Sequence, residues 1–161
     1  MRNQPQSVML FAAGFGTRMG ALTADRPKPL INVAGKPLLD HALHQVAEAG
    51  VARAVVNVHY KAAQIAEHLK GRANTLISWE EDQILETGGG LRAALPLLGA
   101  GPVFTLNTDA VWTGPNPLIN LREQWDGARM DALLLLAPLS RIKGFRGKGD
   151  FLLGPDGRIT R

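Results

Sequence analysis

The chain has 161 residues, of which 45% are hydrophobic and 20% are charged, and these proportions are those of one globular domain with a buried core. It contains no cysteine, which excludes disulfides, thiolate metal sites and a cysteine nucleophile. The formal net charge is +4, but the basic residues Arg141, Lys143, Arg146 and Lys148 lie among glycines, so we expect a solvated loop there and no nucleic acid partner.

No apolar run is long enough to span a membrane, and the amino-terminal sequence MRNQPQS lacks the basic and apolar segments of a signal peptide. These two observations predict a cytoplasmic protein with no membrane partner. The oligomeric state is left open by the sequence.

A glycine-rich turn follows the first predicted strand. The apolar run at residues 7–12 predicts a buried strand, and Gly14 and Gly16 end it. Because glycine has no side chain, the backbone N–H groups of this turn can approach an anion, to which Arg18 adds positive charge and forked donors. Met19 stands where the dinucleotide-binding fingerprint has its third glycine, and no Gly-Lys-Ser/Thr sequence follows, so that fingerprint and the Walker loop are both excluded. The remaining interpretations are a phosphate site of another kind and an ordinary glycine turn of an α/β protein.

Lys28 lies ten residues after Arg18, between two prolines. Pro27 and Pro29 fix their own φ angles and favour an extended conformation in the residue that precedes each of them. We therefore expect the Lys28 ammonium to be held by a stiff segment rather than by a flexible loop.

Strands and helices alternate along the rest of the chain. The predicted elements are a short strand at residues 30–33, a helix at 37–49, a strand at 54–58, a helix at 61–70, a strand at 75–79, a helix opened by the glycines 88–90, a strand at 103–107, a peripheral helix at 115–125, a buried strand at 133–136 within 131–138, and a hairpin around the turn 155–157. This alternation predicts an α/β fold with a parallel sheet covered on both faces by helices.

Asp109 comes just after the strand predicted at residues 103–107, at the sheet edge where we expect the glycine-rich turn. A carboxylate there suits Mg²⁺, which takes one or two carboxylates together with phosphate oxygens and water; the alternative is a turn or helix cap. His41 and His44 lie three residues apart, but no other histidine or cysteine joins them on that helix, so we interpret them as surface residues.

Three consecutive glycines, at residues 88–90, open a predicted helix. Glycine in a helix is costly, so the run indicates that the backbone touches something there, the alternative being a flexible linker. Helical periodicity resumes directly afterwards, which favours the first interpretation. We expect residues 86–90 to lie flat against a nucleobase or a sugar, with backbone amides and carbonyls contacting its polar edges.

The stretch AAGFGTRMGALTADRPKPL, followed by VAGKPLLDHAL, resembles the amino-terminal signature of the sugar-1-phosphate nucleotidylyltransferases. That signature has the general form LAAGxGTRM-x-P-LT-x(3)-PKPL-x-x-V-x-GKP, and Ala21 stands where the family usually has proline. The resemblance implies the nucleotide-diphospho-sugar transferase fold, a Rossmann-like three-layer α/β/α arrangement with a mostly parallel sheet. It also implies an enzyme that transfers a nucleoside monophosphate from a nucleoside triphosphate to a sugar-1-phosphate and releases pyrophosphate.

The resemblance also implies roles for individual residues. Arg18 would hold the β- and γ-phosphates, Lys28 the α-phosphate and the incoming sugar phosphate, and Asp109, in an N-x-D motif with Asn107, one Mg²⁺ ion. The sequence LETGGG is most similar to the second glycine motif of the N-acetylmuramate-1-phosphate uridylyltransferases of cell-wall recycling, so UTP is the favoured nucleotide. The expected nucleotide-binding residues are Ala12, Ala13, Gly14, Gly16, Thr17, Arg18, Glu81, Thr87 and Gly88.

The sequence GDFLLGPDGRI, at residues 149–159, resembles a GDF-x-L-x-x-x-G-x-V segment of the same enzymes. Members of the family continue through further strands that carry sugar-binding residues and a second metal-binding aspartate. We therefore expect residues 1–161 to be a single nucleotidyltransferase domain, the nucleotide-binding part, without the sugar-binding part. Two alternatives stay open: a mannose- or heptose-1-phosphate guanylyltransferase, and a non-catalytic nucleotide-binding domain.

Overall fold

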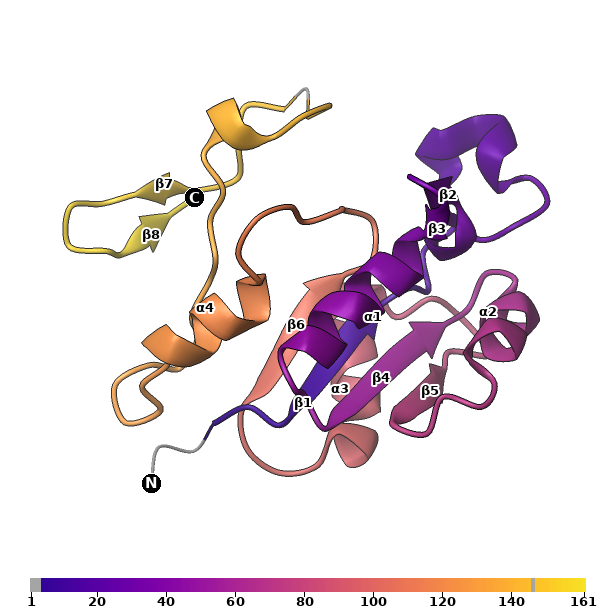
Figure 1. The fold of residues 1–161 in the computed structure, drawn as a ribbon, viewed down its shortest axis with the longest axis horizontal. Helices are drawn as coiled ribbons and strands as arrows, with labels where there is room; N and C mark the ends of the chain where they lie inside the picture. Colours follow the sequence, from indigo (N-terminus) through magenta and orange to yellow (C-terminus); the bar gives the residue numbers. More distant parts are fainter. Residues whose placement is uncertain (1–3, 146) are drawn as a thin grey trace.

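Four parallel strands form the central sheet (Figure 1). The computed structural model describes residues 4–145 and 147–161, so Arg146 of the expected basic loop lies outside the described residues. The strands are β1 (Ser7–Phe11), β4 (Arg53–Val58), β5 (Thr75–Trp79) and β6 (Val103–Asn107), in the order β5-β4-β1-β6. In β1, Phe11 pairs with Asn57 of β4 on one side and with Asn107 of β6 on the other. The last residue of β1 therefore lies beside the carboxyl ends of both neighbouring strands.

Helices cover both faces of this sheet (Figure 1). On one face pack α1 (Leu38–Glu48), α2 (Ala62–Leu69) and α4 (Pro117–Gln124), and on the other packs α3 (Glu86–Leu98). Because side chains alternate along a strand, Val8 and Leu10 of β1 point into the first layer and Met9 points into the second. The predicted three-layer α/β/α fold with a parallel sheet is confirmed. Among residues 4–145 and 147–161, no helix combines the length and the apolar character needed to cross a bilayer.

Short elements connect β1 to α1. Two 3₁₀ helices come first, η1 (Thr17–Thr23) and η2 (Lys28–Leu30), and then the antiparallel pair β2 (Asn32–Val33) and β3 (Lys36–Pro37). The strand expected at residues 30–33 is therefore shorter, because its first residue completes the turn of η2. Most of the other predicted elements form within two residues of their expected bounds.

The chain after α4 runs away from the central sheet (Figure 1). It contains η3 (Leu139–Arg141) and the antiparallel pair β7 (Leu152–Leu153) and β8 (Ile159–Thr160). The turn between β7 and β8 is closed by hydrogen bonds of the Gly154 backbone with Arg158 and Gly157. The hairpin predicted around residues 155–157 is confirmed.

The buried strand predicted at residues 133–136 is wrong. These residues pair with no strand among the described parts of the chain, and the Leu134 and Leu135 side chains are 45% and 37% exposed. Their apolar composition suggested a strand, but a strand is stable only where a neighbour satisfies its backbone N–H and C=O groups. Composition alone does not supply that neighbour.

Candidate active site

An open cleft of about 390 Å³ lies at the carboxyl edge of the sheet. Its walls are the glycine-rich turn after β1, the Lys28 segment, the start of α3 and the residues after β6. Carboxyl edges of parallel strands are where open α/β sheets bind ligands. Of the expected site residues, the cleft lining contains Ala12, Ala13, Gly14, Gly16, Thr17, Arg18, Lys28, Thr87 and Asp109.

The glycine-rich turn begins at a peptide group that is held from both sides. The Phe11 carbonyl accepts a hydrogen bond from Thr108 Oγ1 at 2.7 Å, and the Ala12 N–H donates to Asn57 Oδ1, also at 2.7 Å. The carbonyl and the N–H belong to the same peptide unit, and Asn57 and Thr108 are both buried. Thr108, directly after β6, and Asn57, near the end of β4, thus fix the direction in which the turn leaves the sheet.

Gly16 is required by the shape of the turn. Its φ is +66°, in the left-handed region, and an added Cβ would lie 2.9 Å from Thr23 Cγ2 and 3.1 Å from Lys28 Cβ. Thr23 Oγ1 also donates to the Gly16 carbonyl oxygen at 3.2 Å. This close approach packs the turn against the base of Lys28, so the turn and the cation are placed as one unit.

Residues just after β4 support the same turn. The Phe15 ring lies edge-on to the His59 ring, with centroids 5.4 Å apart, and 5.7 Å from the Tyr60 ring. The Tyr60 hydroxyl donates to the Thr23 carbonyl oxygen at 3.0 Å. His59 and Tyr60 thus pack against the turn and support it.

Lys28 and Asp109 meet in the cleft. Lys28 Nζ lies 2.7 Å from Asp109 Oδ2, an ion pair that joins residues 81 positions apart in the sequence. Both groups keep access to solvent, because 23% of the Lys28 side chain and 45% of the Asp109 side chain are exposed. Pro27 and Pro29 are both buried, in agreement with the stiff segment expected from their sequence.

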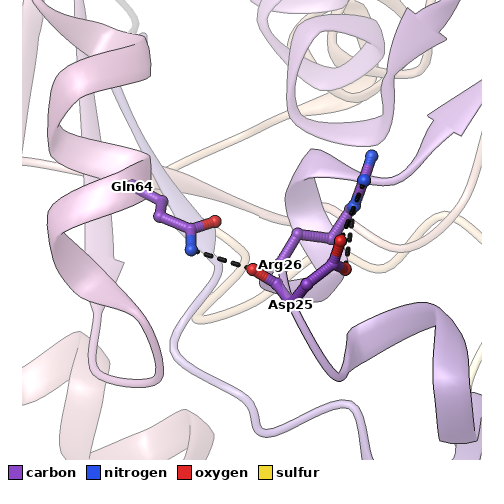
Figure 2. A network of polar contacts seen from close by, with 3 residues as sticks. All are labelled: Asp25, Arg26 and Gln64. Carbon is purple, nitrogen blue, oxygen red and sulfur yellow. Dashed lines mark hydrogen bonds and ion pairs between the residues drawn. The ribbon is translucent and has the colours of Figure 1, made fainter.

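The turn before Lys28 is tied to α2 (Figure 2). Gln64 Nε2 donates to the Asp25 carbonyl oxygen at 2.9 Å, and Arg26 Nη2 lies 3.2 Å from Asp25 Oδ2. The hydrogen bond and the positive charge of Arg26 lower the pKa of the Asp25 carboxyl below its ordinary value. Since this ion pair is exposed, its effect is local, and the Gln64 bond is the contact that links the turn to a helix.

The start of α3 contributes the opposite wall. Glu86 has a φ of +57°, a strained conformation for a residue with a side chain, and it lines the cleft together with Thr87. A Cβ at Gly90 would lie 2.7 Å from Glu80 Oε1 and 2.8 Å from Asn57 Nδ2, whereas a Cβ at Gly88 would meet nothing within 4 Å. The expectation that all of residues 86–90 face a ligand therefore needs correction, because Gly90 packs inward against two buried polar side chains.

Two expected residues, Glu81 and Gly88, are not part of the cleft lining. The neighbouring Glu80 is, and it is only 4% exposed, whereas Glu81 is exposed. Sequence reasoning missed Asn57, Glu80 and Thr108. One signal was available for Asn57, because a polar residue inside the apolar run AVVNV is costly unless its side chain is hydrogen-bonded.

The donor set of the cleft fits one hard divalent cation. In residues 4–145 and 147–161, no three histidine, aspartate or glutamate side chains form a metal-sized cluster. Mg²⁺ does not require one, since it is usually bound through one or two carboxylates plus substrate phosphates and water, and Asp109 offers such a carboxylate. His41 contacts the Val33 carbonyl oxygen and His44 contacts Glu48, so the two histidines have separate partners.

Comparison with known proteins places these features in a family. Residues 8–139 match the model of the MobA-like NTP transferase domain. The chain is 45% identical to N-acetylmuramate alpha-1-phosphate uridylyltransferase of Caulobacter vibrioides over 167 residues, covering 99% of this chain and 69% of that protein. It is 36% identical to the catalytic subunit beta of mannose-1-phosphate guanylyltransferase of Drosophila pseudoobscura pseudoobscura over 113 residues, covering 66% of this chain and 30% of that protein. A nucleotidyl transferase of known structure from Methanothermobacter thermautotroptrophicus shares 25% identity and a TM-score of 0.62, covering 78% of this chain and 59% of that one.

These matches confirm the resemblance inferred from AAGFGTRMG, PKPL and LETGGG. The chain spans about two thirds of the Caulobacter relative and a smaller share of the other two. The matched residues 8–139 include every residue that lines the cleft. The chain belongs to the family of MobA-like NTP transferase domains and is related to the sugar-1-phosphate nucleotidyltransferases.

Proposed function

We propose that this chain is the nucleotide-binding part of a sugar-1-phosphate nucleotidylyltransferase that uses UTP. The observation that carries the proposal is the cleft in which the glycine-rich turn, the cations Arg18 and Lys28 and the carboxylate Asp109 come together. Backbone N–H groups and two cations suit a triphosphate, and a carboxylate beside them suits its divalent counter-ion.

In the proposed reaction, an oxygen of the sugar-1-phosphate attacks the α-phosphorus of the nucleoside triphosphate. The bond from that phosphorus to the oxygen bridging to the β-phosphate breaks, and pyrophosphate leaves with the electron pair. The nucleophile is already an anion, so no side chain has to remove a proton. Catalysis then consists of positioning the two substrates and neutralising the charge that moves onto pyrophosphate.

Two cations of the cleft have separate tasks in this scheme. Arg18 binds the β- and γ-phosphates, and Lys28 binds the α-phosphate and the sugar phosphate. For that, the Lys28 ammonium exchanges the Asp109 carboxylate, 2.7 Å away, for phosphate oxygens. The exchange costs little because both side chains are partly exposed, and it frees the carboxylate.

Asp109, with Asn107 close by in the N-x-D motif, would hold Mg²⁺. When bound, the ion supplies positive charge that stabilises the leaving pyrophosphate. The protein contributes the position of the carboxylate. Asp109 is the second residue after β6 and is next to Thr108, whose side chain is hydrogen-bonded to the end of β1.

UTP is the favoured nucleotide, and N-acetylmuramate-1-phosphate the favoured acceptor. Support comes from the sequence LETGGG and from the 45% identity to a uridylyltransferase over nearly the whole chain. A GTP-dependent transfer to mannose-1-phosphate is the second candidate, favoured by the 36% identity to a guanylyltransferase over 113 residues. We propose the cytoplasm, where nucleoside triphosphates are made, as the compartment.

The test is release of pyrophosphate by the purified chain with Mg²⁺, using each nucleoside triphosphate against a panel of sugar-1-phosphates. We expect release with UTP and N-acetylmuramate-1-phosphate, and none with the Asp109→Asn variant. Release with GTP and a mannose or heptose phosphate would keep the reaction and change its substrates. Tight UTP binding without release from any pair would instead indicate a fragment without the acceptor part or a non-catalytic nucleotide-binding domain.

A further inference from the structure

A chain of three hydrogen bonds connects the two glycine-containing turns underneath the cleft. The Ala12 N–H donates to Asn57 Oδ1 at 2.7 Å, Asn57 Nδ2 donates to Glu80 Oε1 at 2.7 Å, and the Leu85 N–H donates to Glu80 Oε2 at 2.8 Å. Ala12 begins the glycine-rich turn, and Leu85 directly precedes α3. Asn57 and Glu80 are only 3% and 4% exposed, so the bridge between the turns is shielded from water.

All side-chain nitrogen and oxygen atoms of Asn57 and Glu80 take part in these hydrogen bonds. Glu80 accepts through both carboxylate oxygens, and Asn57 accepts with its carbonyl oxygen and donates with its amide. An isosteric amide at position 80 would offer one acceptor where two donors arrive. A carboxylate at position 57 would face a second carboxylate. The order of donors and acceptors from Ala12 to Leu85 is therefore fixed by this pair.

The position of the bridge distinguishes it from an ordinary buried polar pair. It joins the wall that contains the phosphate-facing turn to the wall formed by Glu86 and Thr87. Gly90 lacks a side chain at the point where a Cβ would come within 2.8 Å of both Asn57 Nδ2 and Glu80 Oε1, so α3 is packed directly onto the bridge. A displacement of Glu80 is thus transmitted to the start of α3.

We propose that Asn57 and Glu80 are positioning residues that set the separation between the triphosphate turn and the nucleoside-facing start of α3. This inference rests on the proposed function, since it takes one nucleoside triphosphate to contact both turns at once. A ligand that contacts only the glycine-rich turn, such as inorganic tripolyphosphate, does not depend on the separation. Affinity for UTP does.

The experiment compares E80Q, N57D and the double variant N57D/E80Q, with dissociation constants for UTP and for tripolyphosphate measured by titration calorimetry. Each single variant loses a bond of the bridge. In the double variant, the new carboxylate at position 57 accepts one hydrogen bond from the Ala12 N–H and a second from the N–H₂ group of the new amide at position 80. The carbonyl oxygen of that amide accepts the third, from the Leu85 N–H. All three bonds are restored, the donor and acceptor between the side chains are reversed, and the charge of the pair is unchanged.

We expect each single variant to bind UTP at least tenfold more weakly, with tripolyphosphate affinity changed less than threefold, and the double variant to return to within threefold of the native UTP affinity. Each single variant should also show a raised KM for UTP, with a smaller change in kcat. Ser7→Ala is the matched control, because it removes a buried hydrogen bond, from Ser7 Oγ to the Leu98 carbonyl oxygen, at the opposite end of β1 and α3. Its affinity for UTP should be native.

All titrations are made well below the Tm of each variant, and N57S replaces N57D if N57D does not fold. Native UTP affinity in E80Q, an equal loss for UTP and tripolyphosphate, or a double variant that regains its Tm but not its UTP affinity would each overturn the proposal. If the unmodified chain binds no nucleoside triphosphate more tightly than it binds tripolyphosphate, the proposed function fails instead. The two failures are therefore distinguishable.

Discussion

Lys28 is the residue on which the proposed reaction depends most directly. It pairs with Asp109 in the cleft, and in the proposed reaction it contacts both substrates. Its backbone lies between two buried prolines, and its Cβ packs near Gly16. The ammonium is thus placed by rigid surroundings while its end stays free to change partners.

Lys28→Ala should lower kcat by about a hundredfold or more, because loss of one such cation costs roughly 2 to 4 kcal/mol of transition-state stabilisation. Steady-state release of pyrophosphate measures the change. Lys70→Ala is the control, since Lys70 is exposed and pairs with Glu67 on the surface of α2, and it should turn over at the native rate. Near-native turnover in Lys28→Ala would remove the residue from the mechanism.

Gly90→Ala should lower the free energy of unfolding by about 1 to 3 kcal/mol, because its Cβ would overlap Glu80 Oε1 and Asn57 Nδ2. Gly88→Ala provides the contrast. Nothing lies within 4 Å of a Cβ there, and alanine in a helix is favoured over glycine by roughly 0.5 to 1 kcal/mol, so this variant should be slightly more stable. Urea unfolding of both variants checks the prediction, and equal stabilities would contradict it.

Site residues that belong to a sequence motif could be predicted, whereas site residues that are positioned only by packing could not. Arg18, Lys28 and Asp109 stand in recognisable patterns, and the cleft contains all three. Glu80 and Glu81 are adjacent acidic residues with nothing in the sequence to separate them. Which of the two turns inward depends on how β5 ends, and only the structure shows that Glu80 does.

At the level of elements, continuous apolar runs with a paired neighbour were predicted well. The strands at residues 75–79 and 103–107 have the expected bounds, because each run is short, β-branched or aromatic in part, and ends at polar residues. The run at 133–136 is equally apolar and forms no strand. What differs is the presence of an adjacent strand, a long-range property that local composition does not contain.

The helix α4 is held by its first residues. Asn116 Oδ1 accepts hydrogen bonds from Leu118 N–H at 2.9 Å and Ile119 N–H at 3.3 Å, and Asn116 Nδ2 donates to the Gln45 carbonyl oxygen of α1 at 2.9 Å. One side chain therefore caps α4 and fastens it to its neighbour, on the sheet face covered by α1.

Asn116→Ala should lower the free energy of unfolding by about 1 to 2 kcal/mol, through loss of the cap and of the bond to α1. Asn116→Ser keeps a capping oxygen and loses only the bonds that Nδ2 donates to the Gln45 carbonyl oxygen and to Glu48 Oε2, so its loss should be smaller. Thermal and urea unfolding measure both. A loss in Asn116→Ser equal to that in Asn116→Ala would assign the effect to the α1 contacts instead of the cap.

For the whole molecule, the charged groups of the cleft lie outside the hydrophobic core, so a metal ion in the cleft can affect the proposed reaction without affecting the stability of the fold. The described residues contain no metal-sized cluster of ligands, and the two apolar clusters on either side of the sheet contain neither Lys28 nor Asp109. We therefore expect a divalent cation to matter for the proposed reaction and not for the folding of this domain.

Chelation with EDTA should abolish pyrophosphate release and leave the Tm of the nucleotide-free chain unchanged, and added Mg²⁺ should restore turnover. With Mg²⁺ and UTP at about a hundred times its Kd, the chain should gain about 2.7 kcal/mol of stability by mass action. Differential scanning calorimetry together with the activity assay checks both parts. Turnover that persists in excess EDTA would contradict the assigned role of Asp109.

The peptide unit joining Phe11 to Ala12 has a consequence for the order of folding. Its N–H is satisfied by Asn57, and its C=O by Thr108, 97 residues further along the chain than Phe11. Long loops must be closed before such contacts form, and parallel pairing over such separations is slow. The cleft is therefore complete only after β6 has docked beside β1, so we expect the gain of nucleotide affinity in a refolding experiment to follow that docking and not the initial collapse of the chain.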